Sequence, residues 1–345
     1  MCAIQIQLPI LGENTFLFQV LMPVNTISSF AKKILMYLHR LLKLLIISLI
    51  SGFQSQAQAI ESFEVNDYSS LHNVSIASPS VSKINLETGV TLEYSDIGNP
   101  NGTPVIFLHG FTDSRHSFDY LLPNLPKDIR AIVITQRGHG SSDKPQTGYR
   151  PEDFAADLNA FMNSRNIRQA VIAGHSMGST IAQYFAVYYP EKVSGLVLLS
   201  TIPDLKKNTV IREFGRQVSL LKDPIDHAFA SDFQKSTIHM PIPETFLDTV
   251  INETMKVPSN VWQGVMNGLL DVNISRRLRK IKIPTLLMYG EKDNFSSMAG
   301  QEKLMAQFKN AQLIAYRGVG HALHWEIPHT AARDIAAFVK LIKIP

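Results

Sequence analysis

Cysteine is almost absent from this chain of 345 residues, in which Cys2 is the only example. A single thiol excludes a disulfide framework, and no thiol nucleophile is available in the rest of the chain. Charge is also sparse, because Asp, Glu, Lys and Arg make up 18% of the chain and leave a formal net charge of +4. Four basic residues but only one acidic residue precede residue 60, so the remainder carries 29 basic against 28 acidic residues. This balance predicts no nucleic-acid-binding surface.

Long hydrophobic runs are missing too, with one exception near the N-terminus. Residues 44–53 (LLIISLISGF) are uncharged and follow Arg40 and Lys43. They precede Ala57-Gln58-Ala59, a small-x-small pattern typical of signal-peptidase cleavage. The run is shorter than the roughly 20 residues that a membrane-spanning helix needs. A membrane anchor would have to continue through Lys43 and Arg40, and it is the alternative to a signal peptide.

We therefore expect residues 1–59 to be a leader with a signal peptide that is cleaved near Ala59. This predicts a periplasmic or secreted protein with no stable membrane anchor after leader removal. Met36 is well placed to be the true start of translation, in which case residues 1–35 are not part of the protein. Residues 60–80 are polar and rich in serine, and we interpret them as a linker.

Strand-like and helix-like patterns alternate from residue 81 onward. Helical patterns cover residues 151–164, 176–189, 297–308 and 330–342, and strand-like runs cover residues 83–86, 91–96, 105–108, 131–135, 170–173, 195–199, 285–289 and 312–316. The later runs are continuously apolar, as expected for strands buried on both faces of a parallel sheet. The first two alternate, which predicts an antiparallel hairpin at the sheet edge with Thr91, Glu93 and Ser95 pointing outward.

The alternation is interrupted once, between residues 201 and 282. Helical patterns over residues 210–221, 225–233, 244–256 and 259–270 follow one another there, separated by prolines. We expect this segment to form a helical lid over the carboxyl edge of the sheet, so that residues 81–200 and 283–345 form the core. A second, unrelated domain is the alternative.

The most informative motif is Gly174-His175-Ser176-Met177-Gly178, which lies between a strand-like run and an apolar helical pattern. A Gly-x-Ser-x-Gly in this context makes a turn so sharp that the serine adopts a strained backbone conformation. A Cβ at either glycine would collide with the neighbouring strand and helix. The serine hydroxyl then projects beyond the sheet, above the positive end of the helix. The context favours a nucleophile over an ordinary glycine-rich turn.

A serine needs a base to become a nucleophile, and the chain offers 11 histidines. His321 stands in Val319-Gly320-His321-Ala322, directly after the last predicted strand. We expect it to be the base, with His324 and His329 as competitors. His175 is set aside because the backbone direction of its turn points it away from the serine.

The base in turn needs an acid that holds its tautomer and stabilises the imidazolium. Asp293 follows the strand-like run 285–289 and is the preferred candidate. Glu291 is the local alternative to Asp293. Asp204, shortly after the strand that ends at residue 199, is the distant alternative.

Two backbone N–H groups are candidates for the oxyanion hole. Leu108-His109-Gly110-Phe111-Thr112 follows a predicted strand with a tight turn, and the glycine lets the Phe111 N–H point toward the serine. The N–H of Met177, in the first turn of the following helix, supplies the second donor. We expect His109 to brace this turn rather than to react.

The order Ser176, Asp293, His321, with a histidine–glycine turn upstream, is the α/β-hydrolase order. The motifs around Phe111, Ser176 and His321, together with residues 136–142 (QRGHGSS), resemble lid-bearing serine hydrolases of the α/β-hydrolase fold family. Bacterial esterases, enol-lactonases and cofactor-free haloperoxidases belong to this group. The resemblance spans about residues 82–343. It implies an eight-stranded, mostly parallel α/β-hydrolase sheet flanked by helices, with a helical lid inserted after the sixth strand.

One position departs from the family pattern. The family often has an aspartate two places before the arginine of the Arg-Gly-His-Gly turn, and Thr135 stands there in this chain. That aspartate is usually structural, so the change removes a loop-bracing contact without weakening a catalytic assignment. Arg137 and Asp143 are interpreted as structural residues of the same turn.

The resemblance implies a serine hydrolase that cleaves carboxylic esters through an acyl-enzyme. Relatives that dehalogenate or open epoxides use an aspartate where Ser176 stands. A lactonase, C–C bond hydrolase or perhydrolase with the same triad is the alternative, followed by a hydrolase-like protein that only binds a ligand. We expect no cofactor, no metal and a small ester-like substrate. Trp262, Phe229 and Met266, large apolar residues of the lid, are candidates for the substrate pocket, although their spacing also suits helix packing and favours lid core for most of them.

Overall fold

The computed structural model describes residues 2–9, 15–22, 80–272 and 274–342. They belong to two separate units, one within Met1–Ser69 and the other within Ser70–Pro345. In the first unit, β1 (Cys2–Pro9) pairs antiparallel with β2 (Thr15–Met22). The expected signal peptide, its cleavage site at Ala59 and the expected linker up to residue 79 lie outside the described residues. No helix in the described part of the chain is long and apolar enough to cross a membrane.

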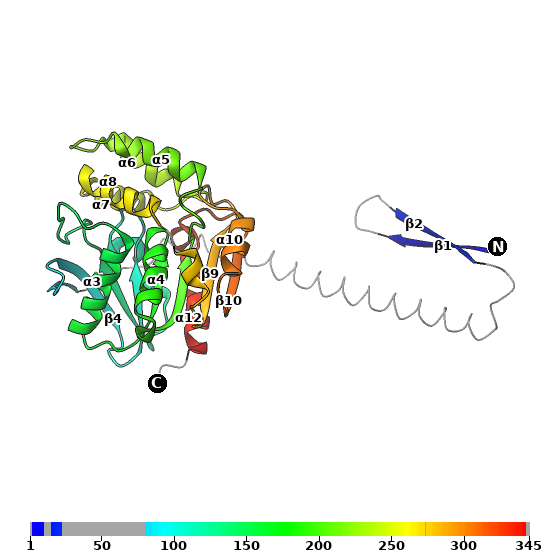
Figure 1. Cartoon of the computed structure of the whole chain (residues 1–345), viewed down its shortest axis with the longest axis horizontal. Helices are drawn as coiled ribbons and strands as arrows, with labels where there is room; N and C mark the ends of the chain where they lie inside the picture. Colours follow the sequence, from blue (N-terminus) through cyan, green and yellow to red (C-terminus); the bar gives the residue numbers. More distant parts are fainter. Residues whose placement is uncertain (1, 10–14, 23–79, 273, 343–345) are drawn as a thin grey trace. The chain divides into compact units, whose positions relative to one another are not determined.

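The second unit, drawn in Figure 1, is built on an eight-stranded sheet. The order of its strands is β10-β9-β8-β7-β5-β6-β4-β3. Its strands are β3 (Val81–Asn85), β4 (Thr91–Gly98), β5 (Thr103–Leu108), β6 (Ile129–Thr135), β7 (Ala170–His175), β8 (Val193–Leu199), β9 (Thr285–Gly290) and β10 (Ala311–Tyr316). β4 runs antiparallel to both β3 and β6, and every other pair is parallel. The mostly parallel eight-stranded sheet expected from the sequence is therefore confirmed.

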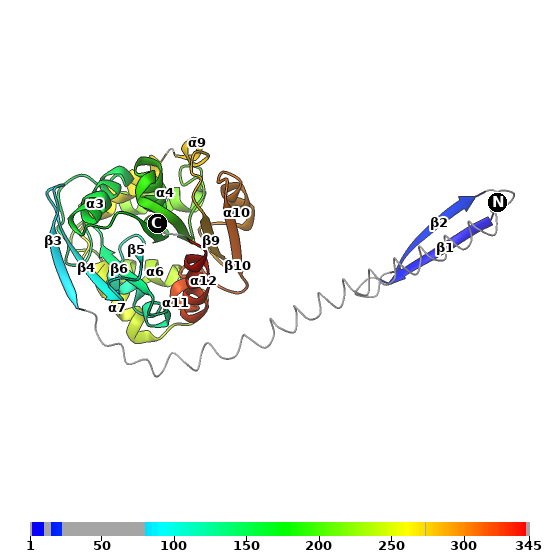
Figure 2. The ribbon, with the colours of Figure 1, turned by 90° about the horizontal axis from the view of Figure 1, so that it is seen from below.

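Helices cover both faces of this sheet (Figure 2). α3 (Pro151–Ser164), α4 (Met177–Tyr188) and α10 (Met298–Met305) pack on one face, and α12 (Pro328–Leu341) packs on the other. Successive residues of each central strand point to opposite faces, so that in β5 Ile106 belongs to the first core and Phe107 to the second. This double burial explains the continuous apolar runs of the parallel strands.

The shorter elements connect these layers. They are α11 (Leu323–Glu326) and the 3₁₀ helices Arg115–Phe118, Leu122–Asn124 and Pro190–Lys192. α3 begins at Pro151, where proline loses nothing because the first helical N–H has no intrahelical acceptor.

The expectation that Thr91, Glu93 and Ser95 all point outward is wrong for two of them. β3 is the edge strand, and β4 lies between β3 and β6. Glu93 is 9% exposed and Ser95 1% exposed. Glu93 accepts a hydrogen bond from Thr135 Oγ1 on the neighbouring strand at 2.9 Å, which explains how a carboxylate is tolerated there.

A helical insertion separates β8 from β9 and lies over one end of the core in Figure 1. It contains α5 (Thr209–Ser219), α6 (His227–Ser236), α7 (Glu244–Met255), α8 (Ser259–Leu270) and the short α9 (Ser275–Leu278). β8 is the sixth strand of the sheet along the chain.

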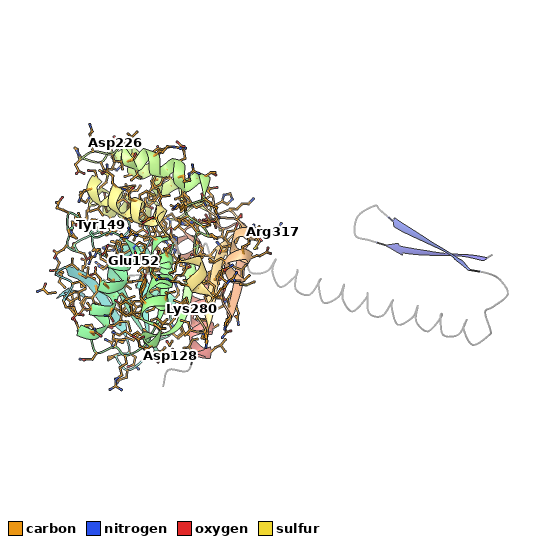
Figure 3. The ribbon with its side chains drawn as sticks, in the orientation of Figure 1. Asp128, Tyr149, Glu152, Asp226, Lys280 and Arg317 are labelled. Carbon is orange, nitrogen blue, oxygen red and sulfur yellow. The ribbon has the colours of Figure 1, made fainter. Side chains whose placement is uncertain are left out.

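Two glycines of α8 allow this helical insertion to pack closely against the core. A Cβ at Gly264 would lie 2.8 Å from the Tyr149 ring, and one at Gly268 would lie 2.4 Å from the Tyr149 carbonyl oxygen. Figure 3 shows Tyr149 beneath α8, and Asp226, the N-cap of α6, at the outer side of the insertion. The backbone of α8 therefore approaches the loop before α3 more closely than any larger residue would allow.

Candidate active site

Ser176 stands at the turn between β7 and α4. Its backbone has φ 50° and ψ −111°, which a residue with a Cβ rarely adopts. The Ser176 N–H donates to the Leu199 carbonyl of β8 at 3.0 Å, and its own carbonyl accepts from Ser179 and Thr180 in the first turn of α4. The serine is thus held in a strained conformation by hydrogen bonds on both sides.

The two glycines that flank this turn are required for the reason that the sequence suggested. A Cβ at Gly174 would lie 2.2 Å from the Gly178 carbonyl oxygen of α4. A Cβ at Gly178 would lie 2.1 Å from the Leu108 carbonyl oxygen at the end of β5. Only glycine at both positions lets α4 start this close to the sheet.

His321 and Asp293 meet at the carboxyl end of β9 and β10. His321 Nδ1 lies 2.9 Å from Asp293 Oδ2, and both side chains are almost fully buried. Asp293 is fixed in turn by the Phe295 N–H at 2.7 Å and the Ser296 hydroxyl at 3.0 Å. With Nδ1–H donating to Asp293, the Nε2 lone pair of His321 is free to act as a base. Ser176 and His321 line the same cavity.

The competitors for the acid occupy other surroundings. Asp204 is exposed and pairs with Lys207 at 2.9 Å. Glu291 is also exposed. Neither carboxylate lines the cavity that contains Ser176.

The two histidines that were alternatives to His321 as the base lie in other surroundings. His324 is fully buried, and its Nε2 contacts the Ser117 hydroxyl at 3.0 Å. Burial lowers the pKa of His324 to about 3, so that it stays neutral at physiological pH. His329 is the second residue of α12 and does not line the cavity.

The two residues expected to supply oxyanion donors line the same cavity as Ser176. Met177 is the first residue of α4, so its N–H has no acceptor within the helix. Phe111 lies in the loop after β5, and both residues line the cavity with Ser176. His109 braces this loop, since its Nδ1 contacts the Gly110 carbonyl at 2.8 Å and its Nε2 accepts from the Gln136 N–H at 2.9 Å.

The cavity above Ser176 has a volume of about 50 Å³ and is lined mainly by apolar side chains from the core and the helical insertion. Of the three expected pocket residues, Met266 lines it. Trp262 and Phe229 are not among the lining residues, and each packs against an aromatic residue that is. The fully buried Trp262 ring packs edge-on against Phe111 with centroids 5.1 Å apart, and Phe229 stacks on Phe214 at 6.1 Å. The lining aromatics Phe214 and Phe233 screen both from the cavity.

Two titratable residues of the cavity, Asp113 and His175, were not proposed as site residues from the sequence. Asp113, two residues after Phe111, accepts hydrogen bonds from the Ser117 hydroxyl at 3.1 Å and from Gln234 Nε2 on α6 at 3.0 Å. His175, set aside as a neighbour of the serine, contacts the backbone carbonyl of His321 through Nε2 at 3.2 Å. Their only sequence signal is adjacency to the two loops that carry the site.

Asp113 and His175 differ sharply in their titration. Burial raises the pKa of Asp113 to about 6, although the hydrogen bonds from Gln234 and Ser117 and the nearby His321 oppose the rise. Burial, reinforced by the neighbouring histidines, lowers the pKa of His175 well below its usual range. Near neutral pH, Asp113 is therefore ionised and His175 is neutral.

Glu326 on α11 fixes the loop that carries His321. Its carboxylate accepts from the Gly320 N–H at 2.9 Å and from the His239 and Met240 N–H groups of the helical insertion, each at 3.0 Å. A Cβ at Gly320 would lie 2.5 Å from Glu326 Oε1, which explains why a glycine precedes His321. Glu326 therefore joins the insertion to the loop of the base.

The turn at residues 135–143 is braced despite the threonine. Thr135 Oγ1 accepts from the Arg115 N–H at 3.2 Å and donates to Glu93. Arg137 forms a bidentate pair with Asp157, with both N–O distances at 2.6 Å. Asp143 Oδ2 accepts from the Thr91 N–H at 2.7 Å. These hydrogen bonds compensate for the bracing contact that was expected to be missing because Thr135 stands in place of an aspartate.

Comparisons with known proteins agree with this fold. The model of the alpha/beta hydrolase fold family matches residues 103–237. The AB hydrolase superfamily protein YisY of Bacillus subtilis is 29% identical over 265 residues, which cover 74% of this chain and 97% of that protein. A bifunctional esterase/perhydrolase of Acinetobacter calcoaceticus is 28% identical over 276 residues, covering 74% and 99% of the two chains. An esterase from Exiguobacterium antarcticum superposes with a TM-score of 0.67 at 23% identity, covering 76% and 100%.

The chain therefore has the α/β-hydrolase fold, and residues 103–237 are similar to the family of that name. It is similar to proteins named as esterases and haloperoxidases. The fold places Ser176, His321 and Asp293 after β7, β10 and β9, in the order that this family uses.

Proposed function

We propose that the protein is a serine hydrolase that cleaves small carboxylic esters through an acyl-enzyme intermediate. The observation that carries the proposal is the convergence of three features on one cavity. They are a strained serine between two obligatory glycines, a histidine bonded to a buried carboxylate, and the residues Phe111 and Met177, whose backbone N–H groups are the expected oxyanion donors. This is the arrangement that acyl transfer requires.

In the proposed reaction, Ser176 Oγ attacks the ester carbonyl while His321 Nε2 takes the hydroxyl proton. The negative charge that develops on the carbonyl oxygen is stabilised by the Phe111 and Met177 N–H groups, each worth about 10²–10³ in rate. His321 then gives its proton to the leaving alcohol and afterwards activates the water that releases the acid. Asp293 holds the imidazole in the required tautomer throughout and stabilises the imidazolium.

The size of the cavity limits the acyl group. The cavity that contains Ser176 has a volume of about 50 Å³ and is lined mainly by apolar side chains. We infer that acetyl to butyryl esters are preferred and that octanoyl esters are poor substrates.

The test is pre-steady-state hydrolysis of 4-nitrophenyl acetate. We expect a burst of 4-nitrophenol that matches the concentration of active enzyme, and no burst from the Ser176→Ala variant. A panel of acetate, butyrate, octanoate, aryl esters and lactones identifies the substrate class. If lactones are turned over faster than any ester, the protein is a lactonase with the same triad and not an esterase. Absence of a burst, together with no labelling of Ser176 by a fluorophosphonate, would contradict the proposal.

We further propose that the enzyme is exported, on the strength of the apolar run at residues 44–53 and the small-x-small pattern ending at Ala59. Cell fractionation and N-terminal sequencing of the mature protein test this. A mature N-terminus near residue 60 outside the cytoplasm supports export. An unprocessed protein in the cytoplasm would rule it out.

A further inference from the structure

In the part of the chain that the structure describes, the residues that line the cavity include an acidic side chain but no permanently basic one. Among the described residues that line it there is one acidic side chain, Asp113, and no lysine or arginine. The remaining titratable side chains of the lining are His175 and His321. An anionic substituent on a substrate would therefore meet a carboxylate and no permanent cation.

Asp113 cannot turn away from the cavity. It is 3% exposed, and its two oxygens are held from opposite sides by Gln234 on α6 and by Ser117 in the loop after β5. Ser117 is itself fixed, because its hydroxyl contacts His324 Nε2 at 3.0 Å and Trp325 Nε1 lies 3.2 Å away. The carboxylate is thus a rigid part of the wall two residues from the oxyanion donor Phe111.

The groups that face Asp113 do not neutralise its charge. His175 Nδ1 lies 4.0 Å from Asp113 Oδ2, but burial keeps the pKa of this imidazole well below its usual range. His324 is also neutral, for the same reason, and Gln234 and Ser117 carry no charge. His321 gains a positive charge when it takes the Ser176 proton in the proposed reaction. Two like charges about 4–6 Å apart in a poorly solvated cavity repel each other strongly.

We propose that Asp113 is a specificity-determining residue that restricts the site to esters whose acyl group carries no negative charge. The inference rests on the proposed ester hydrolysis and names its substrate class: small, uncharged acyl esters rather than half-esters or other anionic compounds. A neutral substituent on the acyl group contacts the apolar lining and is accepted. A carboxylate or sulfonate on the acyl group would lose its hydration on entering the cavity and would gain no counter-ion there, so it is disfavoured.

The experiment compares two 4-nitrophenyl esters of nearly equal size, the 3-sulfopropionate and the 3-(methylsulfonyl)propionate. The sulfonate stays ionised at every pH used, and the sulfone is neutral. At pH 7.5 we expect the wild type to prefer the sulfone by at least about 30-fold in kcat/KM.

In Asp113→Asn, which keeps an acceptor for Gln234, we expect this sulfone-to-sulfonate ratio of kcat/KM to shrink at least about 10-fold because the sulfonate ester is cleaved faster. Asp119→Asn, which removes a carboxylate of the same segment outside the cavity lining, is the matched control and keeps the wild-type ratio.

The wild type provides a second readout that does not depend on a variant. Protonation of Asp113 below pH 6 removes its charge, so the sulfone-to-sulfonate ratio narrows as the pH falls from 7.5 to 5. A pH-independent ratio, an equal rate for both esters, or equal refusal of both esters would overturn the proposal. If no ester, including 4-nitrophenyl butyrate, is hydrolysed, the proposed function fails instead.

Discussion

Gln234 on α6 donates one amide hydrogen to Asp113 Oδ1 at 3.0 Å and one to Thr254 Oγ1 on α7 at 2.7 Å. Thr254 in turn contacts Thr112, the residue that follows Phe111, with the two hydroxyl oxygens 3.3 Å apart. The loop that carries an oxyanion donor is therefore held by side chains of the helical insertion. The insertion supplies more than apolar cover, because it also forms hydrogen bonds with Thr112 and Asp113, the two residues that follow Phe111.

The first prediction concerns this contact. Gln234→Leu removes both hydrogen bonds and leaves the buried Asp113 carboxylate with one donor fewer, which costs about 1–3 kcal/mol of folding free energy. We expect kcat to fall about 10-fold or more while KM changes less than threefold, because the lost positioning is felt most in the transition state. Steady-state kinetics with 4-nitrophenyl butyrate and thermal unfolding measure the two effects.

Ser236→Ala, at the exposed end of the same helix, is the control for Gln234→Leu and should behave as wild type. If Gln234→Leu raises KM and leaves kcat unchanged, Gln234 only shapes the pocket and does not position the loop.

The second prediction concerns the turn at Ser176. Replacing glycine by alanine within a helix ordinarily stabilises it by up to about 1 kcal/mol. At Gly178 the new Cβ would lie 2.1 Å from the Leu108 carbonyl oxygen, so the sign should reverse. We expect Gly178→Ala to lower the free energy of unfolding by about 1–3 kcal/mol or more, measured by urea denaturation, and to reduce ester hydrolysis. A stabilised, fully active Gly178→Ala would show that α4 is not pressed against β5.

The third prediction concerns the pH dependence of stability. The pKa of Asp113 is about 6 in the folded protein and near 3.8 when unfolded, so the folded state binds this proton more tightly. The resulting stabilisation is complete below about pH 4 and is lost as the pH rises through 6. Asp113→Asn has no such proton. Its free energy of unfolding relative to wild type should therefore rise by about 2–3 kcal/mol between pH 4 and pH 7.

Urea denaturation of both proteins at the two pH values measures this difference. A difference between variant and wild type that stays constant with pH would mean that Asp113 titrates at its ordinary pKa.

The fourth prediction concerns chain length. Met266 lines the cavity, whereas Phe229 lies behind it. Met266→Ala should shift the preferred acyl chain upward by about two or three carbons and lower the free energy of unfolding by about 2–5 kcal/mol. Phe229→Leu is the control, and its ranking of acetate, butyrate and octanoate esters should stay that of the wild type. An unchanged ranking in Met266→Ala would place the acyl group elsewhere.

The sheet and the turn at Ser176 could be predicted because their signals are local. Each central strand is a short apolar run, and the steric demand on Gly174 and Gly178 follows from two elements that are adjacent in the chain. The burial of Glu93 was missed because it depends on β6, whose Thr135 lies 42 positions away. Asp113 and Gln234 are 121 positions apart, and neither residue belongs to a motif.

The residues that line the pocket could not be predicted from the sequence for the same reason. Trp262 and Met266 both lie on α8 and are both large and apolar, so the sequence offers no way to choose between them. The arrangement of three helices decides it, since Phe214 of α5 and Phe233 of α6 stack together and cover Trp262 while Met266 stays at the surface of the cavity. Such packing is set by long-range contacts rather than by helical periodicity.

The most direct test of the central claim is rapid-quench mass spectrometry of the wild type mixed with 4-nitrophenyl acetate. A serine hydrolase that uses Ser176 accumulates one acetyl group per chain on the peptide that contains this serine, and the Ser176→Ala variant accumulates none. Hydrolysis of the ester with no acetyl group on that peptide at any time point would contradict the account.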